Sequence, residues 1–312
     1  MIYGLALMAV LGVFVLFAAI TVVNFDYPMI LTGMLGVYLL ILAYSAIGLF
    51  MSSITKYQVV AAIGTLAILA ILNFIGGVGQ EYDFVRNITY WLSITGRSDS
   101  FIEGLMASDD VLYFLIVIGF FLSLSILKLN TEKSIMSFKT KVMKYSAIVV
   151  VAIALGYVSS LSSMKYYYDA TYTKSNTLSK ESQEVLKNLE GDLTITTYVN
   201  LLDESFYYGL PRNRNKDFER FEKYFRFKPD IKMKYVYYYD KANNPSLEWR
   251  YPNKTDDERV DLLCKANRLD IKMFMTPDEI KDIMKLALDA LTVNGEGTAA
   301  SDGEAEEDTE PA

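Results

Sequence analysis

Four carboxylates in the second half of the chain have a spacing that could support chemistry. Asp256, Asp257, Glu258 and Asp261 resemble the groups used for acid–base catalysis or for binding Ca²⁺. Acidic residues in the first turn of a helix are also stabilised by the helix dipole without any ligand. We therefore interpret the cluster as the start of a helix.

Aromatic residues supply the next candidates. The tyrosine-rich segment 235–239 could form a platform for a sugar or an aromatic ligand, and Phe218, Phe221 and Phe225 recur at helical spacing. Such residues pack more often in a core, because strands and amphipathic helices both need one buried apolar face. The sequence favours core packing for both sets.

The chain contains no histidine and one cysteine, Cys264. Ser-His-Asp and Cys-His nucleophile systems and zinc sites with histidine ligands are therefore excluded, and Cys264 is interpreted as a small apolar residue on a helix. A Gly-Lys pair is also missing, so there is no Walker-A loop for ATP. We expect no catalytic, cofactor-binding or metal-binding residues and no cofactor, in a protein that is not an enzyme.

The elements that would position any site are dominated by apolar runs. A helix that crosses a bilayer needs about 20 mainly apolar residues, and we predict five spans with apolar segments near this length: 2–23, 28–50, 57–75, 111–127 and 147–161. The centres of these segments lack charged side chains, which ion-coupled carriers usually need inside the membrane. Any energy for transport should therefore come from another subunit.

Lysines predict the topology. Residues 128–144 hold five lysines and one glutamate, and such short basic loops stay in the cytoplasm. The N-terminus is then cytoplasmic, and the chain after Tyr168 is extracytoplasmic. Residues 80–109 should form two short surface helices, the first presenting Phe84, Ile88, Trp91 and Leu92 on one face, and the second starting at a capping box of Ser100 and Glu103.

The extracytoplasmic segment has the pattern of an α/β domain. Strands are predicted at 193–199 and 231–239, separated by helices, which favours a partly parallel sheet. One helix should begin at Ser179 and bury Val185, Leu186 and Leu189; another should begin at Thr276. Residues 294–312 carry seven acidic and no basic residues and should be disordered.

Two stretches carry a family resemblance. Residues 43–55 (AYSAIGLFMSSIT), then Gln58 to Ala62, resemble the second half of an ABC type-2 exporter permease of the gliding-motility (Gld) group. Residues 80–128 are similar to the surface helices and last span of that family. The segment that opens with Asp169-Ala170-Thr171 and continues through Leu193-Thr194-Ile195 resembles the Gld auxiliary component, in which leucine usually stands at the position of Ala170.

The resemblance implies a permease half at 1–129, a basic cytoplasmic linker at 130–146, a fifth span at 147–163, an extracytoplasmic α/β domain at 164–293 and an acidic tail at 294–312. Both fused halves look truncated, since two earlier spans, an ATPase-coupling helix and a closing span have no counterpart. The implied location is the bacterial inner membrane.

The implied partners are the lipid bilayer, a cytoplasmic ABC ATPase, an envelope cargo and, as a further option, a second permease copy. Nucleic acid is not among them, because the extracytoplasmic segment has no basic patch. The expected function is that of a permease or auxiliary subunit of an exporter-like complex. The alternative is a membrane-anchored binding or scaffold protein without transport activity.

Overall fold

The computed structural model describes residues 2–134, 136–161, 164–189 and 191–295, which fall into two compact units. Unit 1 is formed by Met1–Leu193 and Pro211–Ile231, and unit 2 by Thr194–Leu210 and Lys232–Ala312. The units therefore divide the chain differently from the predicted domain boundary at residue 164.

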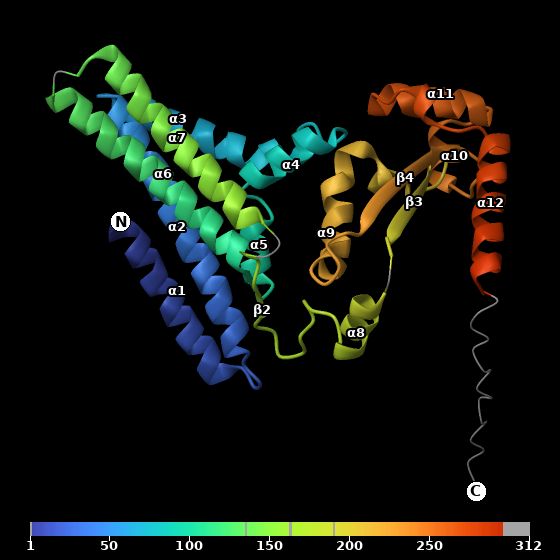
Figure 1. Ribbon diagram of the computed structural model, residues 1–312, viewed down its shortest axis with the longest axis horizontal. Coiled ribbons are helices and arrows are strands. Elements are labelled where there is room, and N and C mark those ends of the chain that lie inside the picture. Colours follow the sequence, from blue (N-terminus) through green and yellow to red (C-terminus); the bar gives the residue numbers. More distant parts are fainter. Residues whose placement is uncertain (1, 135, 162–163, 190, 296–312) are drawn as a thin grey trace, which may run out of the picture. The chain divides into compact units, whose positions relative to one another are not determined.

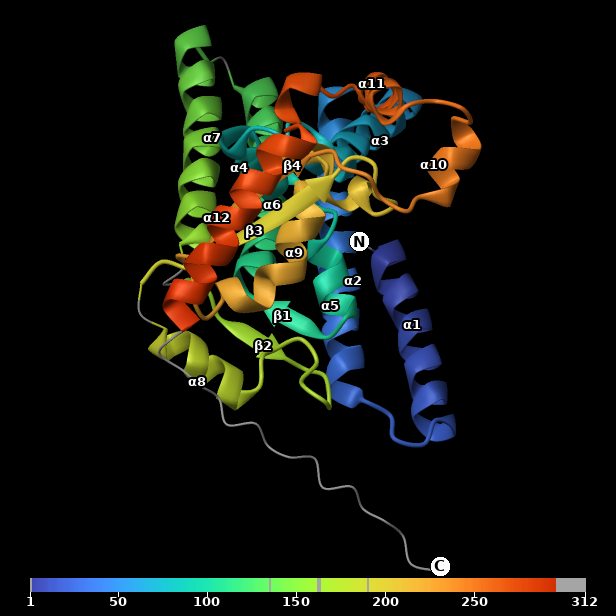
Figure 2. The same cartoon turned by 90° about the vertical axis from the view of Figure 1, so that its right-hand side faces the viewer.

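Five long helices dominate unit 1 (Figures 1 and 2). They are α1 (Ile2–Thr21), α2 (Tyr27–Ile54), α3 (Gln58–Phe74), α6 (Ser108–Lys133) and α7 (Phe138–Ser160). Each is long and apolar enough to span a membrane, as predicted. The chain is thus mostly helical and has the composition of a membrane protein.

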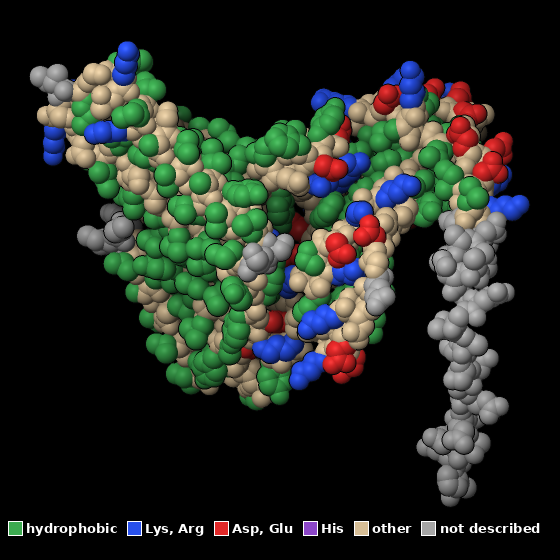
Figure 3. Space-filling model, in the orientation of Figure 1, with side chains coloured by type: hydrophobic (Ala, Val, Ile, Leu, Met, Phe, Trp, Pro, Cys, Tyr) green, Lys and Arg blue, Asp and Glu red, His purple; other side chains and the backbone are tan. Residues whose placement is uncertain are grey.

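Helix α2 lies at the centre of the bundle and packs against α6, α3 and α1. Small residues permit the close approach: Ala43 and Ala46 are fully buried, and Gly36 receives the ring of Phe101. Most side chains on α1, α3 and α7 are apolar and exposed, so the surface of the bundle is largely hydrophobic (Figure 3). Such a surface is suited to lipid.

Helix occupies most of the predicted basic linker. α6 continues to Lys133 and α7 begins at Phe138, so only four residues separate them. The lysines therefore lie on helical turns that extend the two spans.

The segment between α3 and α6 contains η1 (Ile75–Gly77), α4 (Asp83–Leu92), α5 (Arg97–Ile102) and strand β1 (Leu105–Ala107). Two short helices are present, as predicted, but the second was misplaced. Its N-cap is Gly96, and the Ser100 hydroxyl donates to the Gly96 carbonyl from inside the helix. The proposed Ser100–Glu103 capping box is wrong because pairing with a distant strand makes Leu105–Ala107 extended.

The remainder of unit 1 begins with strand β2 (Tyr167–Asp169), which pairs antiparallel with β1. Helix α8 (Lys180–Asn188) follows with Ser179 as its N-cap, as predicted. Its predicted buried face is wrong, since Val185 is 64% exposed and Leu189 is 39% exposed. Helices η4 (Pro211–Asn213) and α9 (Arg214–Phe225) complete the unit.

Unit 2 contains the two predicted longer strands, β3 (Thr194–Asn200) and β4 (Lys232–Tyr238), in parallel register. Its other elements are η3 (Phe206–Gly209), α10 (Pro245–Arg250), α11 (Asp256–Asn267), η5 (Ile271–Met273) and α12 (Pro277–Gly295). The core joins both strands to α10 and α11 through Val199, Tyr237, Leu247 and Leu263. The predicted acidic tail lies, from residue 296 onward, outside the described residues.

Candidate functional site

Within the carboxylate cluster of α11, Glu258 caps the helix and Asp256 pairs with Arg259 of the same helix at 3.3 Å. The Thr255 hydroxyl accepts a hydrogen bond from the Glu258 amide, and the Glu258 carboxylate accepts one from the Thr255 amide. The hydrogen bond from the Thr255 amide, together with Lys254, lowers the pKa of Glu258. No group of three or more histidine, cysteine, aspartate or glutamate residues that could hold a metal ion occurs in the described part of the chain.

The other residues singled out in the sequence take structural positions. Tyr237 and Cys264 are buried in the core of unit 2, and burial raises the pKa of the Cys264 thiol, which disfavours a reactive thiolate. Phe218 and Phe225 stack on each other at 5.7 Å but are only half-buried, so the prediction that they form a core is only partly correct. Phe218 instead lies under the guanidinium of Arg86, 4.3 Å from its ring centre.

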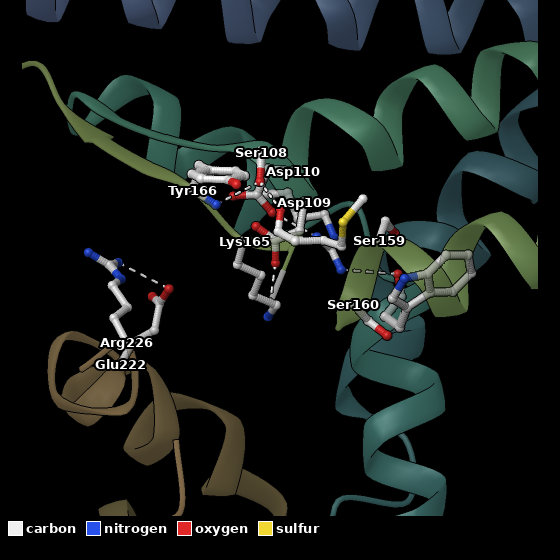
Figure 4. Close-up of polar contacts among 12 residues, drawn as sticks. Ser108, Asp109, Asp110, Ser159, Ser160, Lys165, Tyr166, Glu222 and Arg226 are labelled. Carbon is white, nitrogen blue, oxygen red and sulfur yellow. Dashed lines mark hydrogen bonds and ion pairs between the residues drawn. The ribbon is translucent and has the colours of Figure 1, made fainter. Parts of the chain in front are cut away.

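The structure brings other polar residues together where α6 begins, a region that we call the junction (Figure 4). Arg97 of α5 binds Asp110 of α6 at 2.7 Å, and both side chains are nearly buried. The Arg97 guanidinium also lies 4.4 Å from the centre of the Tyr113 ring. The Tyr113 hydroxyl donates to the Leu92 carbonyl, so one charged residue and one phenol hold α4, α5 and α6 together.

A second set of contacts joins the start of α6 to the segment that follows α7. Lys165 binds Asp109 at 3.1 Å, and Ser108 exchanges hydrogen bonds with the backbone of Tyr166. These contacts continue directly into the β1–β2 pair, in which Met106 lies opposite Tyr168. The chain after the fifth span is therefore attached to the segment between the third and fourth spans.

The motif Asp169-Ala170-Thr171 organises the next turn. The Asp169 carboxylate accepts hydrogen bonds from the Thr171 amide, the Thr171 hydroxyl and the Asn176 amide. The same turn reaches α2, because the Asp26 carboxylate accepts from the Tyr172 amide at 2.9 Å while it also caps α2. A motif that the sequence could describe only as a resemblance thus has a physical role in docking this turn.

Helix α9 is held at both ends. At its start, Asn215 donates to the Gly76 carbonyl and to the Gln80 side chain. At its end, Arg226 donates to the Asn176 carbonyl at 2.8 Å and lies over the Tyr167 ring. The helix is therefore fixed to both the η1–α4 segment and the turn after β2.

Acidic residues of α9 lie within electrostatic range of acidic residues in and just after α5. Partial desolvation, then the neighbouring Glu222 charge, raises the pKa of Glu219, with smaller contributions from Asp99 and Glu103. Burial, with Glu222 and Glu219, also raises the pKa of Tyr90. The negative charge on α9 thus disfavours ionisation of Tyr90 on α4 and interacts with the Asp99 charge on α5.

No protein-family model matches the chain, and neither a curated protein nor a solved structure was found to be similar to it. A function must therefore be argued from the geometry of the junction. The junction contains ion pairs, aromatic contacts and backbone hydrogen bonds, and these hold α4, α5, α6 and the segment after α7 together.

Sequence reasoning missed the junction because its partners are far apart in the chain. Arg86 and Arg97 belong to the segment 80–109, for which surface helices were predicted, whereas both side chains are mostly buried. One signal was available: Arg97 lies between aromatic residues, and the acidic pair Asp109-Asp110 stands directly before an apolar span. A cation and an acid at one membrane end are candidates for pairing.

Proposed function

We propose that the chain is a transmembrane subunit of an ABC exporter-like complex whose energy comes from a separate cytoplasmic ATPase. The observation that carries the proposal is the attachment of the segment after α7 to the α4–α5 segment through β1–β2 and α9. An anchor needs only one span and a linker. Attachment at several points is instead suited to a protein in which movement of the spans is transmitted to the extramembrane segment.

The family resemblance agrees with this proposal. The residues that resemble the permease group lie in α2, in α3 and in the segment from α4 to α6, and those that resemble the auxiliary component run from β2 through α8 to the start of β3. All of them except Thr194 and Ile195 belong to unit 1. We propose that the two functions are combined in one chain, with an extracytoplasmic α/β domain engaging the envelope cargo.

The location follows from the same proposal. The five apolar helices support a membrane protein, and the lysines in the last turns of α6 and the first turns of α7 favour a cytoplasmic location for the turn between these helices. The N-terminus would then be cytoplasmic and unit 2 extracytoplasmic, in a bacterial inner membrane. A link to gliding motility is part of the resemblance only.

Co-purification of the full chain in mild detergent tests the proposal. The expected partner has a Walker-A motif, and its ATP hydrolysis in reconstituted membranes depends on this chain. The junction variant Asp110→Asn provides the matched comparison, because it should weaken coupling while leaving the membrane-spanning helices apolar. If no ATPase is recovered and the Asp110→Asn variant binds an envelope protein as well as the natural chain does, the anchored scaffold becomes the better description.

A further inference from the structure

Six lysines lie near the turns that join α2 to α3 and α6 to α7, at the end of α6 opposite to the junction. We call this set the lysine patch; its members are Lys56, Lys128, Lys133, Lys139, Lys141 and Lys144. Lys128 binds Glu132 at 2.9 Å, and Glu132 is also within electrostatic range of Lys56. Among the described residues, no other carboxylate forms an ion pair with a lysine of this set.

Three of these lysines lie at the start of α7, and the helix fixes their positions. α7 begins at Phe138, so Lys139, Lys141 and Lys144 occupy its first two turns. Phe138 is 81% exposed and Val142, one turn later on the same face, is 47% exposed. Lys139 and Lys141 therefore flank an exposed apolar stripe.

This combination is suited to the boundary of a bilayer. The methylene groups of lysine can lie along apolar side chains while the ammonium group reaches the headgroup layer. Basic residues directly after a span are attracted to anionic lipids, and the effect is several-fold in affinity for each charge. An acidic soluble protein would satisfy the charges but would leave the apolar stripe in water.

We propose that the lysine patch binds the anionic headgroups of phospholipids in the adjacent leaflet, with Phe138 and Val142 inserted beside their acyl chains. The patch would retain these lipids around the ends of α6 and α7 and the turn between α2 and α3. The inference does not depend on the exporter proposal.

The test uses the full chain reconstituted with equal amounts of phosphatidylglycerol and phosphatidylcholine. Lipids that remain bound after purification in detergent are quantified by mass spectrometry. The test variant is Lys133→Gln/Lys139→Gln/Lys141→Gln, which keeps three lysines for membrane orientation. The control is Lys180→Gln/Lys241→Gln/Lys265→Gln, which makes the same change of charge at exposed positions outside the spans.

We expect the natural chain and the control to retain phosphatidylglycerol in excess over phosphatidylcholine. The test variant should lose this preference by about two orders of magnitude, since each of the three lysines near an anionic surface contributes about fivefold. The variant Lys133→Arg/Lys139→Arg/Lys141→Arg should keep the preference because it keeps the charge.

Equal enrichment in the natural chain and the glutamine variant would overturn the proposal. So would an unchanged lipid preference accompanied by loss of a co-purifying acidic protein, since the patch would then be a protein contact. If the triple variant does not fold, the three single Lys→Gln variants provide the same comparison. Loss of lipid preference with retained ATPase binding separates this inference from the proposed function.

Discussion

Gly156 of α7 lies against the indole of Trp91. A methyl group added at Gly156 would come within 2.2 Å of that ring, whereas one added at Gly119 of α6 would meet nothing within 4 Å. Gly156→Ala should therefore lower the free energy of unfolding by about 1 to 3 kcal/mol. Gly119→Ala should be neutral or raise it by up to about 1 kcal/mol, because alanine favours helix. Titration with SDS in mixed micelles measures both; equal values would contradict this packing.

The buried ion pair between Arg97 and Asp110 should contribute measurably to the free energy of unfolding. Asp110→Asn leaves the buried guanidinium without its countercharge and should cost about 3 kcal/mol of unfolding free energy. The paired change Arg97→Met/Asp110→Leu should cost less than Asp110→Asn alone, because it leaves no buried charge. Asp278→Asn, which breaks an exposed pair with Lys281, should have no measurable effect. A double-mutant cycle followed by SDS titration checks this, and additive effects of the two junction changes would argue against direct coupling.

At the scale of elements, the docking of α9 should depend on pH through Glu219. Its pKa in the folded chain is raised above the ordinary 4.5, so folding favours the protonated form, and stability falls as pH rises from 4.5 through the raised value. The groups involved are Glu222 and Lys216 on α9 and Asp99 and Glu103 on the facing segment.

Glu219→Gln should therefore be more stable than the natural chain at pH 8 and equal to it below pH 4.5. Unfolding free energies measured between pH 4 and pH 8 give this difference directly. Glu184→Gln, a matched change on the exposed surface of α8, should not reproduce it. A difference that is constant with pH would show that Glu219 ionises as an ordinary surface carboxyl.

The antiparallel register of β1 and β2 can be tested by disulfide cross-linking. Met106 and Tyr168 face each other across the two strands, and directly opposite residues have Cα atoms about 5 Å apart, within the range of a disulfide. In a Cys264→Ala background, Met106→Cys/Tyr168→Cys should cross-link under mild oxidation. The pair Met106→Cys/Tyr172→Cys should not, because Tyr172 lies beyond the end of β2 and is 91% exposed. Electrophoresis without reductant distinguishes them, and equal cross-linking of the two pairs would mean that this register is not held.

Elements set by local signals could be predicted from the sequence. The caps at Ser179 and Thr276 and the alternating strand at residues 231–239 depend on residues within a few positions of one another. Strand β1 could not be predicted, since its extended backbone depends on a partner more than 60 residues away. The same applies to Arg86, which is buried because α9 supplies the ring of Phe218.

In the molecule as a whole, charged side chains are absent from the centres of the spans and concentrated at their ends, and this distribution determines what orients the chain in the membrane. The spans can take either direction through the bilayer on apolar burial alone, so orientation depends on the lysines. With the lysine patch in the cytoplasm, the turn that contains Tyr172 must be on the other side, because α7 connects the two. If all five candidate spans among the described residues cross the bilayer, the start of α1 and the chain after α7 lie on opposite sides.

Single cysteines in the Cys264→Ala background test this arrangement. Tyr172→Cys should react with a membrane-impermeant maleimide in cells whose outer barrier has been opened, whereas Lys141→Cys should react only after the inner membrane is lysed. Tyr172 is exposed and Lys141 is partly exposed in the structure, so the difference in labelling reports the side of the membrane. Labelling of Lys141→Cys before lysis would reverse the topology. The lysine patch would then face the opposite leaflet, and the cytoplasmic end available to an ATPase would be the junction.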